Sequence, residues 1–285
     1  MLGRIRREAE SITINGSGIQ GVESISASYS SVAQPLRNLG INSIKYTPEG
    51  PQTANLELNT LLTHTLSPDA PVTSTEILQN FTGDISFSGI VNYGTKNFIF
   101  TEGYMETYSA SCAIGEVPQV SATSVIFGEF GTGTLENVPA DSYPSELNIA
   151  SYSSMEISLV EQNSVNELST FKNNRVSSFN VNIATPRVPL YAVGLDTPTG
   201  VIAGTPIEVN VNFEIELDDY EIKNMRLVPD QTVFQSATIT LKKNNSNTKL
   251  LEYSFDDMLL TNESFQGGVN SNATTNFNLR SFILR

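Results

Sequence analysis

The chain has 285 residues, of which 39% are hydrophobic, so it can fill the cores of two domains of ordinary size. Its formal net charge is −14, and no cluster of basic residues exists beyond Arg4, Arg6 and Arg7, which excludes nucleic-acid binding through neutralised phosphates. Cys112 is the only cysteine, which excludes an intramolecular disulfide framework and a cysteine-rich zinc site, and we expect a small buried side chain there.

The N-terminal segment predicts neither a secretory route nor a membrane anchor. Residues 1–10 begin with basic side chains, as a signal peptide does, but no apolar stretch follows them. No run elsewhere approaches the roughly 18 consecutive apolar residues of a membrane helix. We therefore expect no membrane among the partners of this protein.

The first predicted strand has a counterpart in the second half of the chain. Residues 22–29 align with residues 176–183 when the sequence is shifted by 154 positions. At the same shift, the motif Pro-Leu-x-x-x-Gly at residues 35–40 aligns with the same motif at residues 189–194. A repeat of this length indicates a duplicated domain, because solenoid units are much shorter. Two similar domains in one chain predict a pseudo-symmetric building block of a larger assembly.

Period-two alternation of apolar and polar residues predicts β-strands in both copies. It is clearest at residues 209–217, where every odd-numbered residue is apolar and every even-numbered residue is polar. Such a strand has one face in a core and the other face in water. Turn sequences rich in glycine, proline and asparagine separate many of the alternating stretches. The further alternating stretches are residues 25–29, 86–91, 120–127, 179–183, 237–241 and 277–282.

Helices are scarce in the predicted fold. The best candidate is residues 74–81, because Thr73 and Glu76 have the spacing of a capping box. Residues 218–225 are its expected counterpart in the second copy, and residues 164–172 are a third candidate.

These elements predict a mainly β protein of two tandem, similar antiparallel domains. Each domain is expected to be a β-sandwich or half-barrel with one short helix. The segment between the two copies has no counterpart and is interpreted as a connector, within which a strand near residues 155–160 is an option. The predicted parts are an N-terminal arm at 1–13, a first domain at 14–133, a connector at 134–173 and a second domain at 174–285.

The sequence contains no recognisable catalytic or metal-binding constellation. His64 is the only histidine, so a Ser-His-Asp arrangement cannot occur in both copies, and we expect a structural histidine there. The carboxylates at 214–221 lack the spacing of a calcium loop and are expected to form a solvated face. The glycines at 128–133 resemble a hairpin loop more than a phosphate-binding loop. We therefore expect no enzyme and no cofactor.

The order of elements resembles that of the tail tube proteins of long-tailed bacteriophages, which share their fold with the inner tubes of contractile injection systems. In the first copy, an alternating strand is followed by Pro-Leu-x-x-x-Gly, a long strand near 56–62 and the predicted helix, and the copy closes with segments at 98–101, 104–109 and 120–127. The second copy repeats this order. The resemblance covers most of the chain.

The resemblance implies a structural virion protein and a set of partners. Members of the family form stacked hexameric rings whose strands close an inner β-barrel, and DNA passes through the acidic lumen during ejection. Some members fuse two tube domains, so three chains form a pseudo-hexamer. The implied partners are further copies of the chain and the tape measure, baseplate and terminator proteins of the tail. The implied location is the virion tail, assembled in the host cytoplasm.

Two groups of site residues follow from this interpretation. The polar faces of the two long strands are expected to line the lumen, and the Pro-Leu-x-x-x-Gly motifs are expected at a ring interface, because proline marks a strand end or a bulge. The expected lumen residues are Glu57, Asn59, Glu208, Asn210, Asn212, Glu214 and Glu216. The expected interface residues are Pro35, Leu36, Gly40, Pro189, Leu190 and Gly194.

Other classes of protein remain open at this point. A tail hub or baseplate protein built on the same fold would have the same sequence features. A β-sandwich that binds a receptor or decorates a capsid would also be acidic and rich in serine, threonine and asparagine. A hydrolase that uses two carboxylates is a third alternative, but nothing pairs carboxylates at matching positions of the two copies.

Overall fold

In the computed structural model, all the described regular elements are β-strands. The structure describes residues 11–19, 21–30, 33–36, 45–48, 53–63, 85–93, 96–133, 155–161, 170–173, 175–193, 195, 197–216, 233–242, 249–269 and 271–283. Within these ranges no helix is long and apolar enough to cross a membrane. The helices predicted at 74–81 and 218–225 lie outside the described residues. The third predicted helix is wrong at its C-terminal end, because Thr170–Asn173 pair as a strand.

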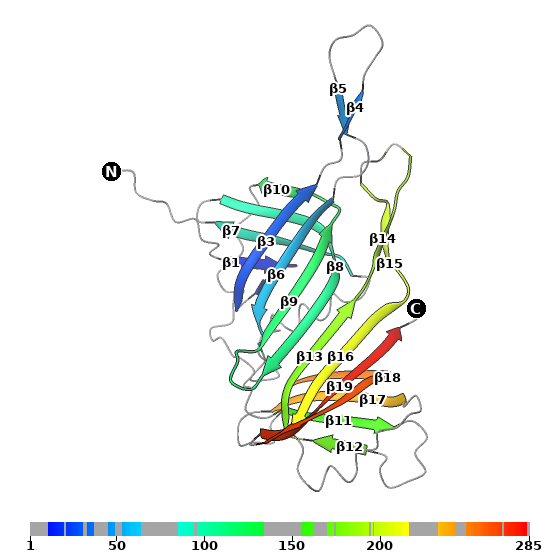
Figure 1. Cartoon of the computed structure of the whole chain (residues 1–285). Helices are drawn as coiled ribbons and strands as arrows, with labels where there is room; N and C mark the ends of the chain where they lie inside the picture. Colours follow the sequence, from blue (N-terminus) through cyan, green and yellow to red (C-terminus); the bar gives the residue numbers. More distant parts are fainter. Residues whose placement is uncertain are drawn as a thin grey trace, which may run out of the picture.

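An antiparallel inner sheet of eight neighbouring strands runs through the centre of the molecule (Figure 1). It contains most of the alternating stretches of the sequence. Its order is β3 (Val22–Ser30), β6 (Thr53–Leu61), β9 (Gln119–Ile126), β8 (Lys96–Ala113), β13 (Val176–Ala184), β16 (Ile207–Glu216), β19 (Ser271–Ile283) and β18 (Lys249–Gly268).

The remaining strands form two outer groups and two hairpins. The first group is β1 (Ser11–Ile14), β2 (Ser17–Ile19), β7 (Phe87–Tyr93) and β10 (Phe130–Gly133), which join the first half of β8. The second group is β11 (Met155–Glu161), β12 (Thr170–Asn173) and β17 (Val233–Lys242), which join the first half of β18. The hairpins are β4 (Ala33–Leu36) with β5 (Lys45–Pro48), and β14 (Arg187–Leu190) with β15 (Gly200–Ala203). Figure 1 shows the outer strands crossing behind the inner sheet.

The same series of strand pairs occurs twice along the chain. In the first half, β2, β1, β7, β8, β9, β6 and β3 pair in succession. In the second half, β12, β11, β17, β18, β19, β16 and β13 do the same. One further pair, β8 with β13, joins the two series into a continuous sheet. The predicted connector at 134–173 contains β11 and β12, and the predicted arm at 1–13 reaches into β1, so both segments contribute strands.

The long strands β8 and β18 each belong to both layers and bend where they pass from one to the other. Each bend contains a non-glycine residue with positive φ, Glu102 at 51° in β8 and Asp257 at 50° in β18. A left-handed backbone is costly for such residues and persists where the surrounding structure requires it. Gly103 follows the first bend, where an added Cβ would lie 3.2 Å from the ring of Phe87. The two halves of the chain therefore share not only their strand pairs but also the backbone conformation at this bend.

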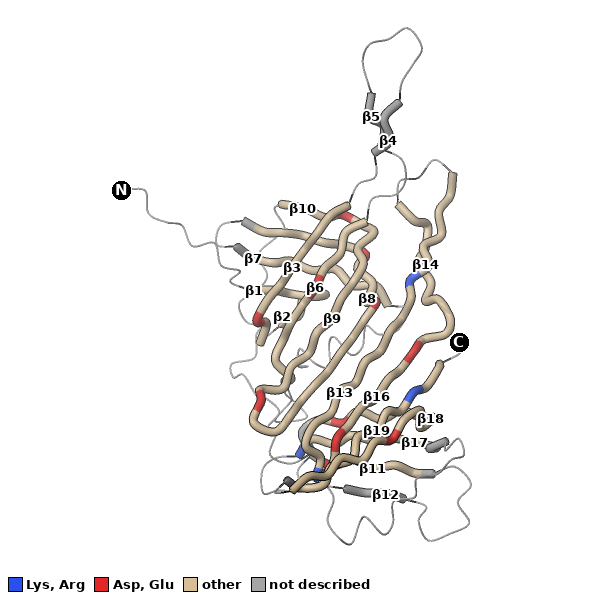
Figure 2. Tube along the Cα trace, in the orientation of Figure 1, with Lys and Arg blue, Asp and Glu red and all other residues tan. Residues whose placement is uncertain are grey.

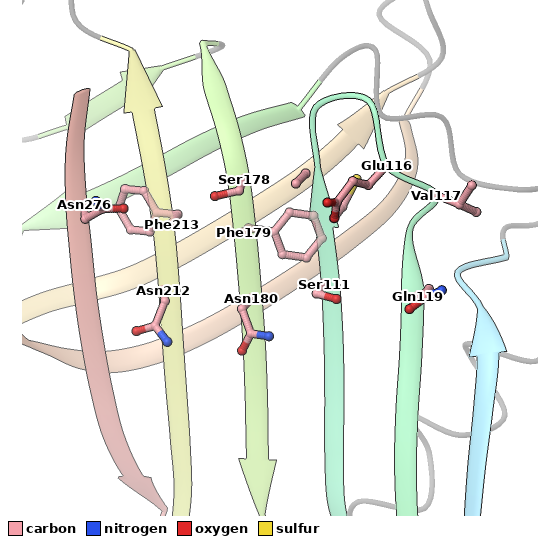
Figure 3. A pocket seen from close by; sticks show the side chains of 12 residues that line it. Ser111, Glu116, Val117, Gln119, Ser178, Phe179, Asn180, Asn212, Phe213 and Asn276 are labelled. Carbon is pink, nitrogen blue, oxygen red and sulfur yellow. The ribbon is translucent and has the colours of Figure 1, made fainter. Parts of the chain in front are cut away.

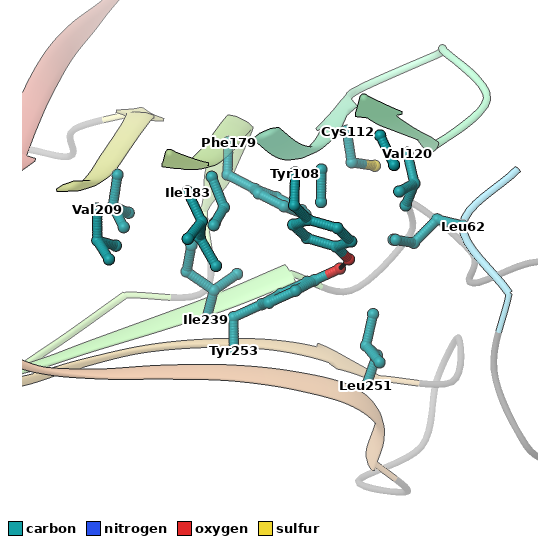
Figure 4. Packing of buried hydrophobic residues seen from close by; sticks show 14 of the residues in the cluster. Leu62, Tyr108, Cys112, Val120, Phe179, Ile183, Val209, Ile239, Leu251 and Tyr253 are labelled. Carbon is teal, nitrogen blue, oxygen red and sulfur yellow. Dashed lines mark hydrogen bonds between the residues drawn. The ribbon is translucent and has the colours of Figure 1, made fainter. Parts of the chain in front are cut away.

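A hydrophobic core lies between the inner sheet and the outer strands. The odd-numbered residues of β16 are buried there, as their alternation predicts. At the junction of the two series, Tyr108 and Tyr253 are buried and their hydroxyl groups hydrogen-bond at 2.8 Å (Figure 4). Burial raises the pKa of both hydroxyls. Cys112 lies nearby and is buried, as predicted, and burial with the nearby Glu116 raises the pKa of its thiol to about 11.

The tyrosine pair allows a prediction about stability. Tyr108→Phe removes one hydroxyl and leaves that of Tyr253 buried without its partner, so we expect a loss of about 1–3 kcal/mol in the free energy of unfolding. Tyr108→Phe combined with Tyr253→Phe removes both polar groups, and its cost is expected to be well below the sum of the single costs. Urea unfolding of the three variants measures these values. If the loss in the double variant equals the sum of the losses in the two single variants, the two hydroxyl groups do not act as an isolated hydrogen-bonded pair.

Candidate functional site

One face of the inner sheet is covered mainly by uncharged polar side chains. Directly opposed residues on neighbouring strands form continuous rungs across this polar face, and one rung crosses seven strands. It consists of Ser24, Asn59, Ser121, Ser109, Asn182, Asn210 and Arg280. Amides and hydroxyls of this kind donate and accept hydrogen bonds without a net charge.

The predicted lumen residues all lie on this polar face. The five residues of β16 do so because they alternate with the buried residues of that strand. Asn59 shares a rung with Asn210, and Glu57 lies one rung further along β6, between Ser26 and Thr123. The structure therefore brings residues of the two copies onto one surface, whereas their role as a lumen lining stays a prediction.

Sequence reasoning missed much of the polar face. The polar residues of β8, β13 and β19 were not assigned to it, although residues 179–183 and 277–282 alternate clearly. The missed members include Ser109, Asn180, Asn182, Asn276 and Asn278. Alternation alone gives a polar side to every strand, and only the pairing of β8 with β13 shows that these sides are continuous.

The charges on the polar face are few and mainly negative. Figure 2 shows isolated carboxylates along the inner sheet and few basic positions. Glu208 accepts hydrogen bonds from the Asn210 amide at 2.8 Å and from Arg280 at 2.9 Å. The amide of Asn210, and then the guanidinium of Arg280, lower the pKa of the Glu208 carboxyl. Glu57, Glu214 and Glu216 carry further negative charge, so the net charge of the face is negative.

A shallow hollow of about 280 Å³ lies on the polar face where the two series meet. Its floor includes the side chains of Ser111, Asn180 and Asn212, which come from three neighbouring strands (Figure 3). Glu116 and Val117, from the turn after β8, lie at its side. The hollow combines uncharged polar side chains of this face with the carboxylate of Glu116.

The inner sheet ends in two open edges. Among the described strands, β3 pairs only with β6, and the second half of β18 pairs only with β19. Unpaired strand edges carry free N–H and C=O groups and readily add another strand. The sheet can therefore be extended at both ends.

The predicted interface motifs lie in the two hairpins. Pro35 and Leu36 are in β4, while Pro189 and Leu190 are in β14. Gly40 and Gly194 lie outside the described residues. The β14–β15 hairpin is closed by hydrogen bonds from the Thr199 N–H and Oγ1 to the carbonyl of Leu190. Its exposed apolar side chains are Val188, Leu190, Tyr191, Val193, Leu195 and Ile202. An interface role for the hairpins stays a prediction.

No protein-family model matches this chain, and no curated protein matches its sequence. Within the described ranges, no three His, Cys, Asp or Glu side chains come together in a way that could hold a metal ion. His64 and residues 217–221 of the acidic group lie outside those ranges. Within the described residues, the polar face and the open edges are thus the features that bear on function.

Proposed function

We propose that this chain is the tube subunit of a bacteriophage tail, assembled into stacked rings whose lumen conducts DNA. The observation that supports this most is the repeated series of strand pairs, which joins through β8 and β13 into one inner sheet with a polar face and two open edges. Each series is taken as one tube-like domain. Further copies of the chain would extend the inner sheet into a closed barrel.

The chemistry of the polar face suits a channel for a polyanion. Carboxylates such as Glu57 and Glu214 repel phosphates, so DNA is kept away from the wall. Amides and hydroxyls form weak and interchangeable hydrogen bonds with a passing duplex. Lysines at these positions would hold the DNA by releasing its counterions. A smooth lining without basic clusters therefore favours movement over binding.

The internal repeat suggests the number of chains in a ring. Each chain supplies two similar wedges, and closed rings of identical contacts are the usual outcome of a head-to-tail interface. Three chains would supply six wedges and give pseudo-sixfold symmetry. The virion tail is the proposed location, with tape measure, baseplate and terminator proteins as neighbours.

The mass of the assembled ring tests this proposal. We expect electron microscopy of the purified protein to show rings or tubes, and native mass spectrometry of single rings to give three chains. A ring of six chains would contradict the pseudo-hexamer. A protein that stays monomeric at high concentration, with no rings in any condition that supports tail assembly, would contradict the proposed function itself.

A further inference from the structure

The pairing of β8 with β13, here called the internal joint, shows how the edge strands of the two series combine within one chain. The second half of β8 pairs with β13, from Thr107 opposite Ala184 to Ala113 opposite Ser178. The core side of this internal joint is fully packed, and Tyr253 of the outer layer covers it. Its buried side chains are Tyr108, Ala110 and Cys112 on β8, and Phe179, Val181 and Ile183 on β13.

The two open edges are the counterparts of the strands in this joint. β3 corresponds to β13, because Ile25 lies opposite Leu58 as Phe179 lies opposite Phe213. The second half of β18 corresponds to that of β8, because each follows the bend with positive φ and each pairs with the strand that comes next in the chain. In this correspondence Glu263, opposite Phe277, takes the place of Tyr108.

Both open edges carry apolar side chains that face an incomplete core. Ala27 and Tyr29 lie opposite the buried Leu56 and Ala54, so they are on the core side of the sheet. Tyr29 is nevertheless 52% exposed, whereas its counterpart Ile183 is 9% exposed. On β18, Phe265 lies opposite the buried Thr275 but is 57% exposed, whereas its counterpart Ala110 is fully buried. Each open edge therefore carries core-side apolar residues that a second strand would cover, as happens in the internal joint.

We propose that β3 of one chain pairs antiparallel with residues 262–268 of β18 in a second copy, in the register of the internal joint. Ser28 then lies opposite Ser264 of the second copy, and Ala27 lies opposite its Phe265. This inference rests on the proposed function, since it names the contact by which the rings form. The register follows from Ser109 opposite Asn182 in the internal joint.

Side-chain sizes and polarity support this register. In the internal joint the small side chain of Ala110, on β8, lies opposite the larger Val181, on β13. The proposed joint also pairs a small with a large side chain, but the large one, Phe265, is on the β18 strand and the small one, Ala27, is on β3. Glu263 would lie opposite Tyr29, whose hydroxyl can donate to the carboxylate. Burial already raises the pKa of Glu263 in a single chain.

The proposed joint also continues both surfaces of the sheet. The polar side of β3 carries serines that would lie opposite Ser264 and Gln266, so the uncharged rungs pass from one chain to the next. The contact is heterologous, so each added copy leaves the same two edges free until a ring closes.

Disulfide trapping tests the register. Ser28→Cys combined with Ser264→Cys is expected to cross-link chains when assemblies are oxidised with copper phenanthroline, giving a ladder of covalent oligomers. Ser24→Cys with Ser264→Cys is displaced by four residues, or about 13 Å, which a disulfide cannot span. Ser109→Cys with Asn182→Cys is the positive control, since this pair is opposed within the chain and reports whether the pair type can be bridged. Cys112 is buried and is not expected to react.

The outcomes separate the register from the function. Interchain cross-links at Ser28 and Ser264, with few at the displaced pair, support the proposed joint. Suppose instead that all variants form rings and the Ser109 and Asn182 control forms its disulfide, but the Ser28 and Ser264 pair does not cross-link. This result overturns the register and leaves the tube function standing, whether or not the displaced pair cross-links. Chains that neither form rings nor cross-link overturn both.

Discussion

Particles that carry Glu214→Lys together with Glu216→Lys are expected to build tails of normal length and to eject their genome about tenfold more slowly or not at all. A tenfold change needs only about 1.4 kcal/mol in the barrier to movement. The two lysines would replace repulsion of DNA by attraction at every chain of every ring. The rate of DNA release from purified particles, triggered in vitro, measures the effect.

The structure indicates that these lysines are compatible with folding. Both glutamates are half-exposed on the polar face, where a long cationic side chain can remain in water. Glu129→Lys with Asp256→Lys is the matched control, since it makes the same change of charge at two exposed positions away from the polar face, one between β9 and β10 and one in the first half of β18. The control is expected to eject normally. Normal ejection by the Glu214 and Glu216 variant as well would count against a channel lined by this face.

The same variant allows a binding measurement without particles. The purified wild-type protein is expected not to retain a short DNA duplex, whereas the double lysine variant is expected to bind it with an affinity that falls steeply as salt increases. A salt-independent interaction would indicate that the lysines do not contact phosphates.

Local alternation was sufficient to predict the strands that have one buried and one polar face. Residues 209–217 alternate without exception, and β16 has the expected buried and polar sides. The shift of 154 positions likewise predicted a repeat, and the strand pairs recur at that spacing in β3 and β13. These features depend on residues close in sequence or on the comparison of two copies.

Features that depend on distant pairing could not be predicted in this way. β8 and β18 each pair with different strands in their two halves, and the bends at Glu102 and Asp257 have no glycine at the positive-φ position to mark them. One local signal was overlooked. Asn15-Gly16, with φ of 48° and 79°, is the turn sequence that favours a tight hairpin, and it joins β1 to β2.

The same substitution, to aspartate, is expected to have very different effects on the free energy of unfolding at two equivalent positions of the repeat. Val181→Asp places a carboxylate at a fully buried position of the internal joint, where no partner compensates it. A loss of about 3–5 kcal/mol is expected, which is a large part of the stability of an ordinary domain. Ala27→Asp changes the counterpart on β3, which is exposed in a single chain, so its cost should be within about 0.5 kcal/mol.

Ala27→Asp is expected to prevent assembly, although the single chain tolerates it. Ala27→Asp would place its charge against Phe265 of the next chain inside a closed core, so the folded variant is expected to remain monomeric in sedimentation experiments. Ser88→Asp is the control, because it places the same carboxylate at an exposed position of the outer strand β7, away from both open edges of the inner sheet, and it is expected to form rings. Thermal unfolding of the dilute variants separates stability from assembly. Rings of normal mass from Ala27→Asp would show that β3 is not at the contact between chains, because a carboxylate buried without a partner against an aromatic ring cannot be accommodated there.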